Sequence, residues 1–193
     1  MGSGAVFSIR YGEGSQTKLK ESMGASFLLI FCTALVLNLL VFLFIDPILS
    51  LLQVPEEIYG MMRDYLWVIF WGIMATFFYN YFASLLRAVG NSLLPLIFLA
   101  VCAILNIVLD LWFVLGLSWG VKGAAFATVI SQYVSGIGLA AYTYIRLPDF
   151  RLGRKYLSPK FSMIKEIAQF SFLTSLQQSV MNLGILMVQG LVN

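Results

Sequence analysis

The chain has 193 residues, of which 60% are hydrophobic and only 11% are charged, and its mean hydropathy is +0.89. Soluble domains carry about 45–50% apolar and about 25% charged residues, so this composition excludes a soluble globular domain and a disordered chain and indicates a membrane protein. The net charge of +3 says little by itself, and the chain has no histidine, the commonest general base and metal ligand. Its two cysteines, Cys32 and Cys102, lie in apolar runs, where we expect buried thiols and neither a disulfide nor a metal site.

Five apolar stretches are long enough to cross a bilayer as helices, which takes roughly 17–25 residues each. They predict an all-α, polytopic membrane protein. The predicted spans are Gly24–Ile45, Tyr65–Leu86, Leu93–Leu117, Gly123–Ile145 and Ile167–Val192. Residues 1–23 are expected to be a cytoplasmic loop with the end of a preceding helix, and residues 146–165 a basic linker between two helical bundles. Because the last span has no polar tail after it, we expect the chain to be a piece of a longer protein.

Lysine and arginine alternate between the loops. Three lie in the N-terminal segment, one in the second loop and six in the fourth, against one each in the first and third loops. The richer side comprises Arg10, Lys18, Lys20, Arg87, Arg146, Arg151, Arg154, Lys155, Lys160 and Lys165. Basic loops remain in the cytoplasm, so we expect the N-terminus inside and the end of the chain outside. Compact loops without a targeting sequence favour the plasma membrane of a bacterium, its inner membrane.

Asp110 interrupts one of the most apolar runs of the chain. An aspartate at the centre of a membrane helix costs about 2.5–3.5 kcal/mol, so such a residue is a functional candidate by default. Asn106 shares its helix face at a spacing of four residues. A carboxylate there can exchange a proton or bind sodium, with Asn and Thr oxygens as further hard ligands. The alternative is a structural aspartate satisfied by Asn106, by a neighbouring helix or at the outer interface.

The fourth span carries small residues at every fourth position, which predicts a close packing face; they are Gly123, Ala127, Ser131 and Ser135. Thr128 and Gln132 lie beside that face. A membrane threonine usually bonds the carbonyl four residues earlier, and Gln132 is a candidate residue of a substrate cavity. The last span contains three polar residues that either pack between helices or face a ligand in a cavity, and the sequence favours neither role; they are Gln177, Gln178 and Asn182. Asn38 and Asn80 are expected to form hydrogen bonds between helices.

Enzyme signatures are missing from the sequence. It has no nucleotide-binding P-loop, no glycine-rich turn after a strand and no nucleophile–base pair, so we expect no catalytic residue and no metal site. The basic loop could bind nucleic acid in isolation, but its position follows from the orientation rule and no nucleic-acid partner is expected.

Three motifs together resemble the multidrug and toxic compound extrusion (MATE) family. The first, residues 86–95, is Leu-Arg-Ala-Val-Gly-Asn-Ser-Leu-Leu-Pro, similar to the family's Arg-x-x-Gly-Asp/Asn-x-x-x-Pro loop. The second, residues 105–110, is Leu-Asn-Ile-Val-Leu-Asp, similar to its Leu-Asn-Ile-x-Leu-Asp. The third, residues 119–132, begins Trp-Gly-Val-Lys-Gly-Ala-Ala-Phe-Ala-Thr and is similar to its Gly-Val-x-Gly-Ala-Ala-x-Ala-Thr.

The resemblance implies a twelve-helix transporter of two lobes, of which this chain would hold helices three to seven. Such proteins export organic cations and other amphipathic compounds by alternating access, driven by inward proton or sodium flow, and need no other cofactor. Asn106, Asp110 and Thr128 match the family's coupling residues on helices five and six, whereas the carboxylate of helix one lies outside this chain. Gln178 stands nearest to a glutamate that some sodium-coupled members carry. The implied partners are the lipid bilayer, drug substrates and the remaining helices.

Two other functions compete with drug efflux. A lipid-linked oligosaccharide flippase of the same superfamily tends to hold pyrophosphate with cationic residues in a central cavity, and no Lys or Arg lies deep in a predicted span here. A membrane scaffold without transport activity would use Asp110 only as a buried hydrogen-bonding group.

Overall fold

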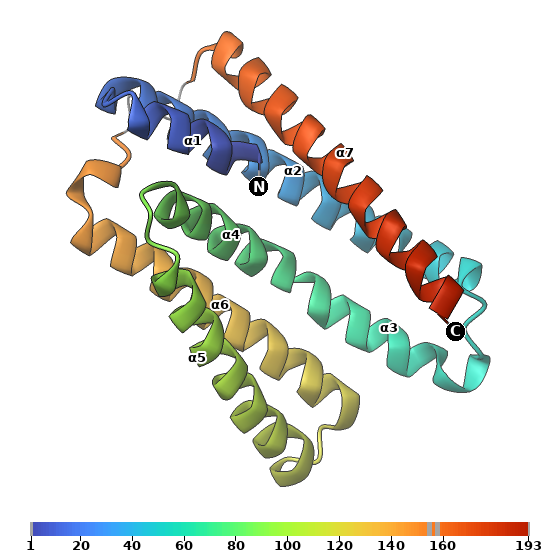
Figure 1. The fold of residues 1–193 in the computed structure, drawn as a ribbon. Helices are drawn as coiled ribbons and strands as arrows, with labels where there is room; N and C mark the ends of the chain where they lie inside the picture. Colours follow the sequence, from blue (N-terminus) through green and yellow to red (C-terminus); the bar gives the residue numbers. More distant parts are fainter. Residues whose placement is uncertain (1, 154–155, 157–158, 193) are drawn as a thin grey trace.

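The structure, a computed structural model, describes residues 2–153, 156 and 159–192. These residues form helices and short connections without any strand, which confirms the all-α prediction (Figure 1). The elements in chain order are α1 (Gly2–Gly12), α2 (Gln16–Leu51), α3 (Glu56–Phe70), α4 (Gly72–Ala88), α5 (Leu93–Asp110), the π-helix η1 (Leu111–Gly116), α6 (Gly120–Arg146), the 3₁₀ turn η2 (Pro148–Phe150) and α7 (Phe161–Val192).

Four helical segments of the described residues are long and apolar enough to cross a membrane. They are α2, α3 with α4, α5 with η1, and α6, and they contain the first four predicted spans except Leu117, which follows η1. The fifth predicted span lies in α7, which is helical but is not among the four. Gln177, Gln178 and Asn182 lower the hydropathy of α7, and its crossing of the membrane stays a prediction.

The helices extend past the predicted spans on the side away from the basic loops. α2 continues from Ile45 through Pro47 to Leu51, and α3 begins at Glu56 instead of Tyr65. Pro55 precedes the first turn of α3 and Glu56 and Glu57 lie within it, a favourable arrangement at a helix N-terminus. The Arg63 Nε lies 2.8 Å from Asp46 Oδ1 and ties these two helix ends together.

On the basic side, the segment expected as a loop is more ordered than predicted. Residues 1–23 contain α1, a short turn and the first residues of α2, although Met1 is outside the described residues. The first part of the expected linker packs on the bundle, because Phe150 is buried in a core cluster with Phe7 and Tyr81. Arg154 and Lys155 of that linker are also outside the described residues.

α6 is the central helix of the α3–α6 bundle and packs against α3, α4 and α5. All four small residues that predicted its packing face are buried, which confirms that face; they are Gly123, Ala127, Ser131 and Ser135. The backbones of α4 and α6 come close together at Gly136. A Cβ atom built there would lie 2.9 Å from the Ala75 carbonyl oxygen and 3.3 Å from Phe78 Cβ.

The span formed by α3 and α4 is interrupted at Trp71, where two side chains of neighbouring helices bond the backbone. Asn38 of α2 donates its Nδ2–H to the Phe70 carbonyl at 2.7 Å, as expected for a bond between helices. The Tyr133 hydroxyl of α6 donates to the Trp71 carbonyl at 3.0 Å. The expectation for Asn80 is wrong, since its Nδ2–H donates to the Thr76 carbonyl of the same helix at 2.9 Å, a local bond that needs no neighbouring helix.

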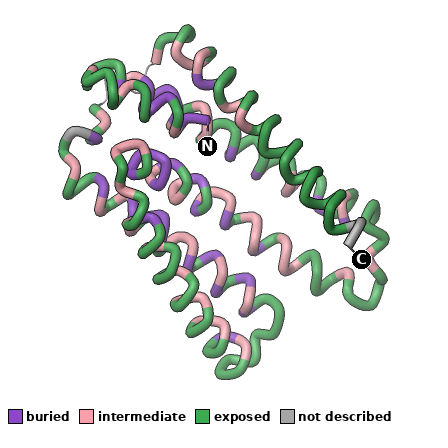
Figure 2. The backbone as a smooth tube through the Cα atoms, viewed as in Figure 1, coloured by how far each residue is buried: buried purple, intermediate pink, exposed green. Residues whose placement is uncertain are grey.

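α7 packs along α1 and α2 on the far side of the molecule from α5 (Figure 1). Its buried and half-buried side chains all lie between Met163 and Thr174, and the described side chains beyond Thr174 are exposed (Figure 2). Contact between α7 and the rest of the described chain is therefore confined to the half nearer the basic side.

The close approach at Gly136 gives a prediction for stability. Gly136→Ala should lower the free energy of unfolding by roughly 1–3 kcal/mol, because the new methyl group meets a backbone carbonyl that cannot move aside. Gly60→Ala in α3 is the matched control, since no atom lies within 4 Å of its added Cβ and alanine favours a helix. Thermal unfolding of the purified proteins in detergent measures the stability of both variants. Equal midpoint temperatures for Gly136→Ala and Gly60→Ala would contradict the close α4–α6 contact.

Candidate functional site

The first sequence motif forms the turn between α4 and α5. Gly90 has a φ of 83°, a left-handed conformation that favours glycine. The Asn91 N–H donates to the Leu86 carbonyl at 2.9 Å, and Asn91 Oδ1 accepts the Leu94 N–H at 3.2 Å. The motif thus ends one helix and begins the next, and it directs α5 back along α6.

The second and third motifs meet where α5 packs on α6. Asn106 Nδ2–H donates to Thr128 Oγ1 at 3.3 Å, and the Thr128 hydroxyl donates to the Ala124 carbonyl at 3.0 Å. The bond from Thr128 to its own helix is the one expected from sequence, and the bond from Asn106 joins the two helices. Both side chains are half-buried.

Asp110 lies one turn beyond Asn106, at the last residue of α5. Its Oδ1 is buried and has no hydrogen-bond partner among the described residues. The π-helix η1 begins at the next residue, and π-helical turns occur frequently at functional sites. Gly123 of α6 packs tightly on this turn, since a Cβ built there would lie 3.1 Å from Phe113 Cβ. A buried carboxylate oxygen without a protein partner is suited to accept a proton or a cation.

A cavity of about 220 Å³, the three-helix cavity, lies between α4, α5 and α6 on the basic side of the Asn106–Thr128 contact. Gln132 follows Thr128 by one turn and Cys102 precedes Asn106 by one turn, so both helices present further polar atoms in line with the Asn106–Thr128 contact. The lining residues are Ala75, Thr76, Tyr79, Asn80, Leu99, Cys102, Gln132 and Ser135. Gln132 is the one residue proposed for a substrate cavity that lines this space.

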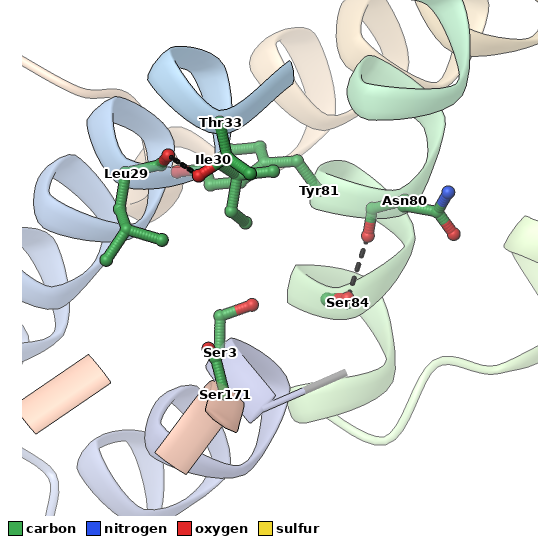
Figure 3. Close-up of a pocket in the computed structure, with 8 residues that line it drawn as sticks. All are labelled: Ser3, Leu29, Ile30, Thr33, Asn80, Tyr81, Ser84 and Ser171. Atoms are coloured by element: carbon green, nitrogen blue, oxygen red, sulfur yellow. Dashed lines mark hydrogen bonds between the residues drawn. The ribbon is translucent and has the colours of Figure 1, made fainter. Parts of the chain in front are cut away.

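A second cavity, the four-helix cavity, has a volume of about 310 Å³ and lies between α1, α2, α4 and α7. Its lining is rich in hydroxyl groups and comprises Ser3, Leu29, Ile30, Thr33, Asn80, Tyr81, Ser84 and Ser171 (Figure 3). Two of the hydroxyls are engaged by their own helices, since Thr33 donates to Leu29 and Ser84 donates to Asn80. Sequence reasoning missed Ser3, Thr33, Ser84 and Ser171, because single hydroxyl residues in apolar runs carry no spacing signal.

The polar residues of α7 lie apart from both cavities. Gln177, Gln178 and Asn182 are exposed, and Gln178 Nε2–H donates to Asn182 Oδ1 at 3.5 Å. Because α7 packs on α1 and α2, the structure brings Asn106, Asp110, Thr128 and Gln132 together on α5 and α6 but leaves these three residues on another face. Within the described residues, no group of three or more His, Cys, Asp or Glu side chains is placed to hold a metal ion.

The two cysteines differ in environment. Cys102 is half-buried, as its place in the cavity requires, whereas Cys32 is exposed on α2 and the expectation that it is buried is wrong. An apolar run in a membrane helix includes residues that face lipid, so the run alone does not identify the inner face.

This difference predicts unequal reactivity. The polar lining of the three-helix cavity can hold water, whereas the surroundings of Cys32 are apolar side chains of the helix surface. In single-cysteine variants in membranes, Cys102 should react with a methanethiosulfonate reagent on the order of tenfold faster than Cys32, because only a hydrated thiol forms the thiolate. Faster modification of Cys32 would contradict a hydrated cavity.

Comparison with known proteins was made against family models, curated proteins and solved structures. Residues 1–112 match the family model MatE. A probable multidrug resistance protein NorM of Thermotoga maritima is 30% identical over 97% of this chain and 41% of its own length. A probable multidrug resistance protein YpnP of Bacillus subtilis is 32% identical over 77% of this chain and 33% of its own length.

The fold has a solved counterpart. A crystal structure of MATE in the bent conformation superposes with a TM-score of 0.87 over 96% of this chain and 42% of that chain, at 23% identity. The chain spans about two fifths of the length of these relatives.

Proposed function

The chain belongs to the MatE family, and from that premise we propose that it is part of a secondary active efflux antiporter in the plasma membrane of a bacterium. Its basic side faces the cytoplasm. The transporter exports organic cations and other amphipathic compounds by alternating access, in exchange for inward-moving protons or sodium ions. The relatives that are named multidrug resistance proteins support export of drugs as the activity.

The observation that carries the proposal is the environment of Asp110. Its buried Oδ1 lacks a partner among the described residues, and the Asn106–Thr128 bond lies one turn away. A proton on this carboxylate, or a sodium ion held with Asn106 and Thr128 oxygens, would remove an unpaired charge from the bundle. Binding of the ion favours the packing of α5 and α6 in which the charge is neutralised, and that preference can shift the conformational equilibrium.

The cavities support neutral contacts with the drug. Among the described residues that line the two cavities, none is Lys, Arg, Asp or Glu. Aromatic and aliphatic side chains with a few hydroxyl and amide groups suit amphipathic compounds. Pyrophosphate would need cationic partners, so this lining disfavours the flippase alternative.

The first test is Asp110→Asn in the whole transporter. The amide keeps the shape of the carboxyl group but carries no charge, so it can neither take up a proton nor attract a sodium ion. Drug efflux from cells should therefore fall to the level of cells without the transporter. Asp46→Asn is the matched control. This carboxylate is exposed and pairs with Arg63 where α2 and α3 meet, so efflux by the variant should stay within about twofold of the parent.

The amount of protein in the membrane and its elution volume in size-exclusion chromatography in detergent should be the same for both variants and the parent. Unchanged efflux by Asp110→Asn would refute ion coupling at this residue. A parent that exports no more drug than cells without the transporter would favour the scaffold alternative. Efflux by vesicles under an imposed pH gradient or sodium gradient then identifies the coupling ion.

A second test separates the hydroxyl of Thr128 from its volume. Thr128→Val removes the acceptor of the Asn106 amide and leaves that donor unpaired, so ion-driven efflux should fall on the order of tenfold. Thr128→Ser keeps the hydroxyl and should stay within about twofold of the parent. Loss of efflux in Thr128→Ser, with Thr128→Val like the parent, would mean that the methyl group matters and the hydrogen bond does not.

A further inference from the structure

α1 and α7 run antiparallel and meet along a seam that begins at the four-helix cavity. At its inner end the backbone of Gly2 lies against Ser171, because a Cβ built at Gly2 would be 2.6 Å from the Ser171 nitrogen. One turn along α1, Val6 packs on Ile167, and these two side chains are 1% and 0% exposed. Ser3 and Ser171 belong both to this seam and to the cavity lining, where they lie side by side (Figure 3).

An ion pair closes the seam at its basic end. Arg10, one turn beyond Val6, places its Nη2 2.8 Å from Glu166 Oε1 of α7. Its Nη1 lies 3.2 Å from both carboxylate oxygens of Glu13 in the turn before α2. The Arg10 side chain is 17% exposed, so the guanidinium is largely enclosed by its partners. The pair joins positions 156 residues apart in the chain.

The two sides of the cavity differ. On the basic side the seam covers it, from the Gly2–Ser171 contact to the Arg10–Glu166 pair. On the opposite side the described side chains of α7 beyond Thr174 are exposed. The contact of α7 with the described helices therefore lies on the basic side of the cavity.

We propose that the α1–α7 seam is the cytoplasmic gate of this cavity and that the Arg10–Glu166 ion pair is its latch, shut in this structure. The proposal rests on the alternating-access function above. The seam combines the small residues Gly2, Ser3 and Ser171 with the buried apolar pair Val6 and Ile167. The latch lies at the water boundary, where both charged groups can be hydrated again when they part. Removing the pair should therefore shift the equilibrium toward the open gate without unfolding the bundle.

The test measures access to the cavity and not drug export. Ser171→Cys is introduced into the whole transporter with its other cysteines replaced, and inside-out membrane vesicles are treated with a membrane-impermeant maleimide. The parent should react slowly, because Ser171 lies behind the shut seam. Glu166→Gln and Arg10→Gln should each react about fivefold faster.

Arg63→Gln is the matched control. It breaks the ion pair of Arg63 with Asp46, which also has a distance of 2.8 Å. This pair joins α2 to α3 on the side of the molecule away from the basic loops. Its labelling rate should equal that of the parent.

Unchanged labelling in both Glu166→Gln and Arg10→Gln would overturn the latch. Equal acceleration by Arg63→Gln would overturn it as well, since the effect would then be general loosening of the bundle. Drug efflux by the parent is measured separately, so a protein that labels as expected but exports nothing would refute the efflux function and leave the gate in place.

Discussion

Inside a bilayer no water is available to backbone groups, so each freed carbonyl needs a partner within the protein. This constraint decides how the interrupted span of α3 and α4 is held. At the break, the side chains of Asn38 and Tyr133 donate hydrogen bonds to the Phe70 and Trp71 carbonyls from the helices on either side. The break therefore links α2, the α3–α4 span and α6 by specific bonds, in an environment where apolar packing alone gives little preference for one arrangement.

Asp110 Oδ1 is one of four buried side-chain atoms of the described residues that have no hydrogen-bond partner. The polar groups around it are matched, since Asn106 bonds Thr128 and Thr128 bonds the backbone of its own helix. The π-helical turn after Asp110 and the tight packing of Gly123 fix the surroundings of the carboxylate without supplying it a donor. A group that is buried, ionisable and unpaired is expensive to keep, and a mobile ion that relieves the cost can move the helices that carry it.

Two of the helix contacts that involve glycine differ in what surrounds them. At Gly136 the backbones of α4 and α6 approach beside the cavity that α4, α5 and α6 line. At Gly2 the approach of α1 to α7 is followed by the apolar pair Val6 and Ile167 and then by a charged pair at the basic end. The second contact therefore ends in groups that water solvates well.

The helical class, the first four spans and the packing face of α6 follow from the sequence, because bilayer thickness and the four-residue spacing of small side chains are local properties. Asp110 and Asn106 are conspicuous in an apolar run, whereas Thr128 became a candidate through the family resemblance, and the role of all three stays a prediction. The tertiary structure was needed to show that Asn80 bonds its own helix, that Cys32 is exposed, and that Ser3 and Ser171 meet beside a cavity. Those outcomes depend on which helices become neighbours, and in lipid an apolar side chain is equally suited to the interior and to the outer surface, so hydropathy cannot choose between them.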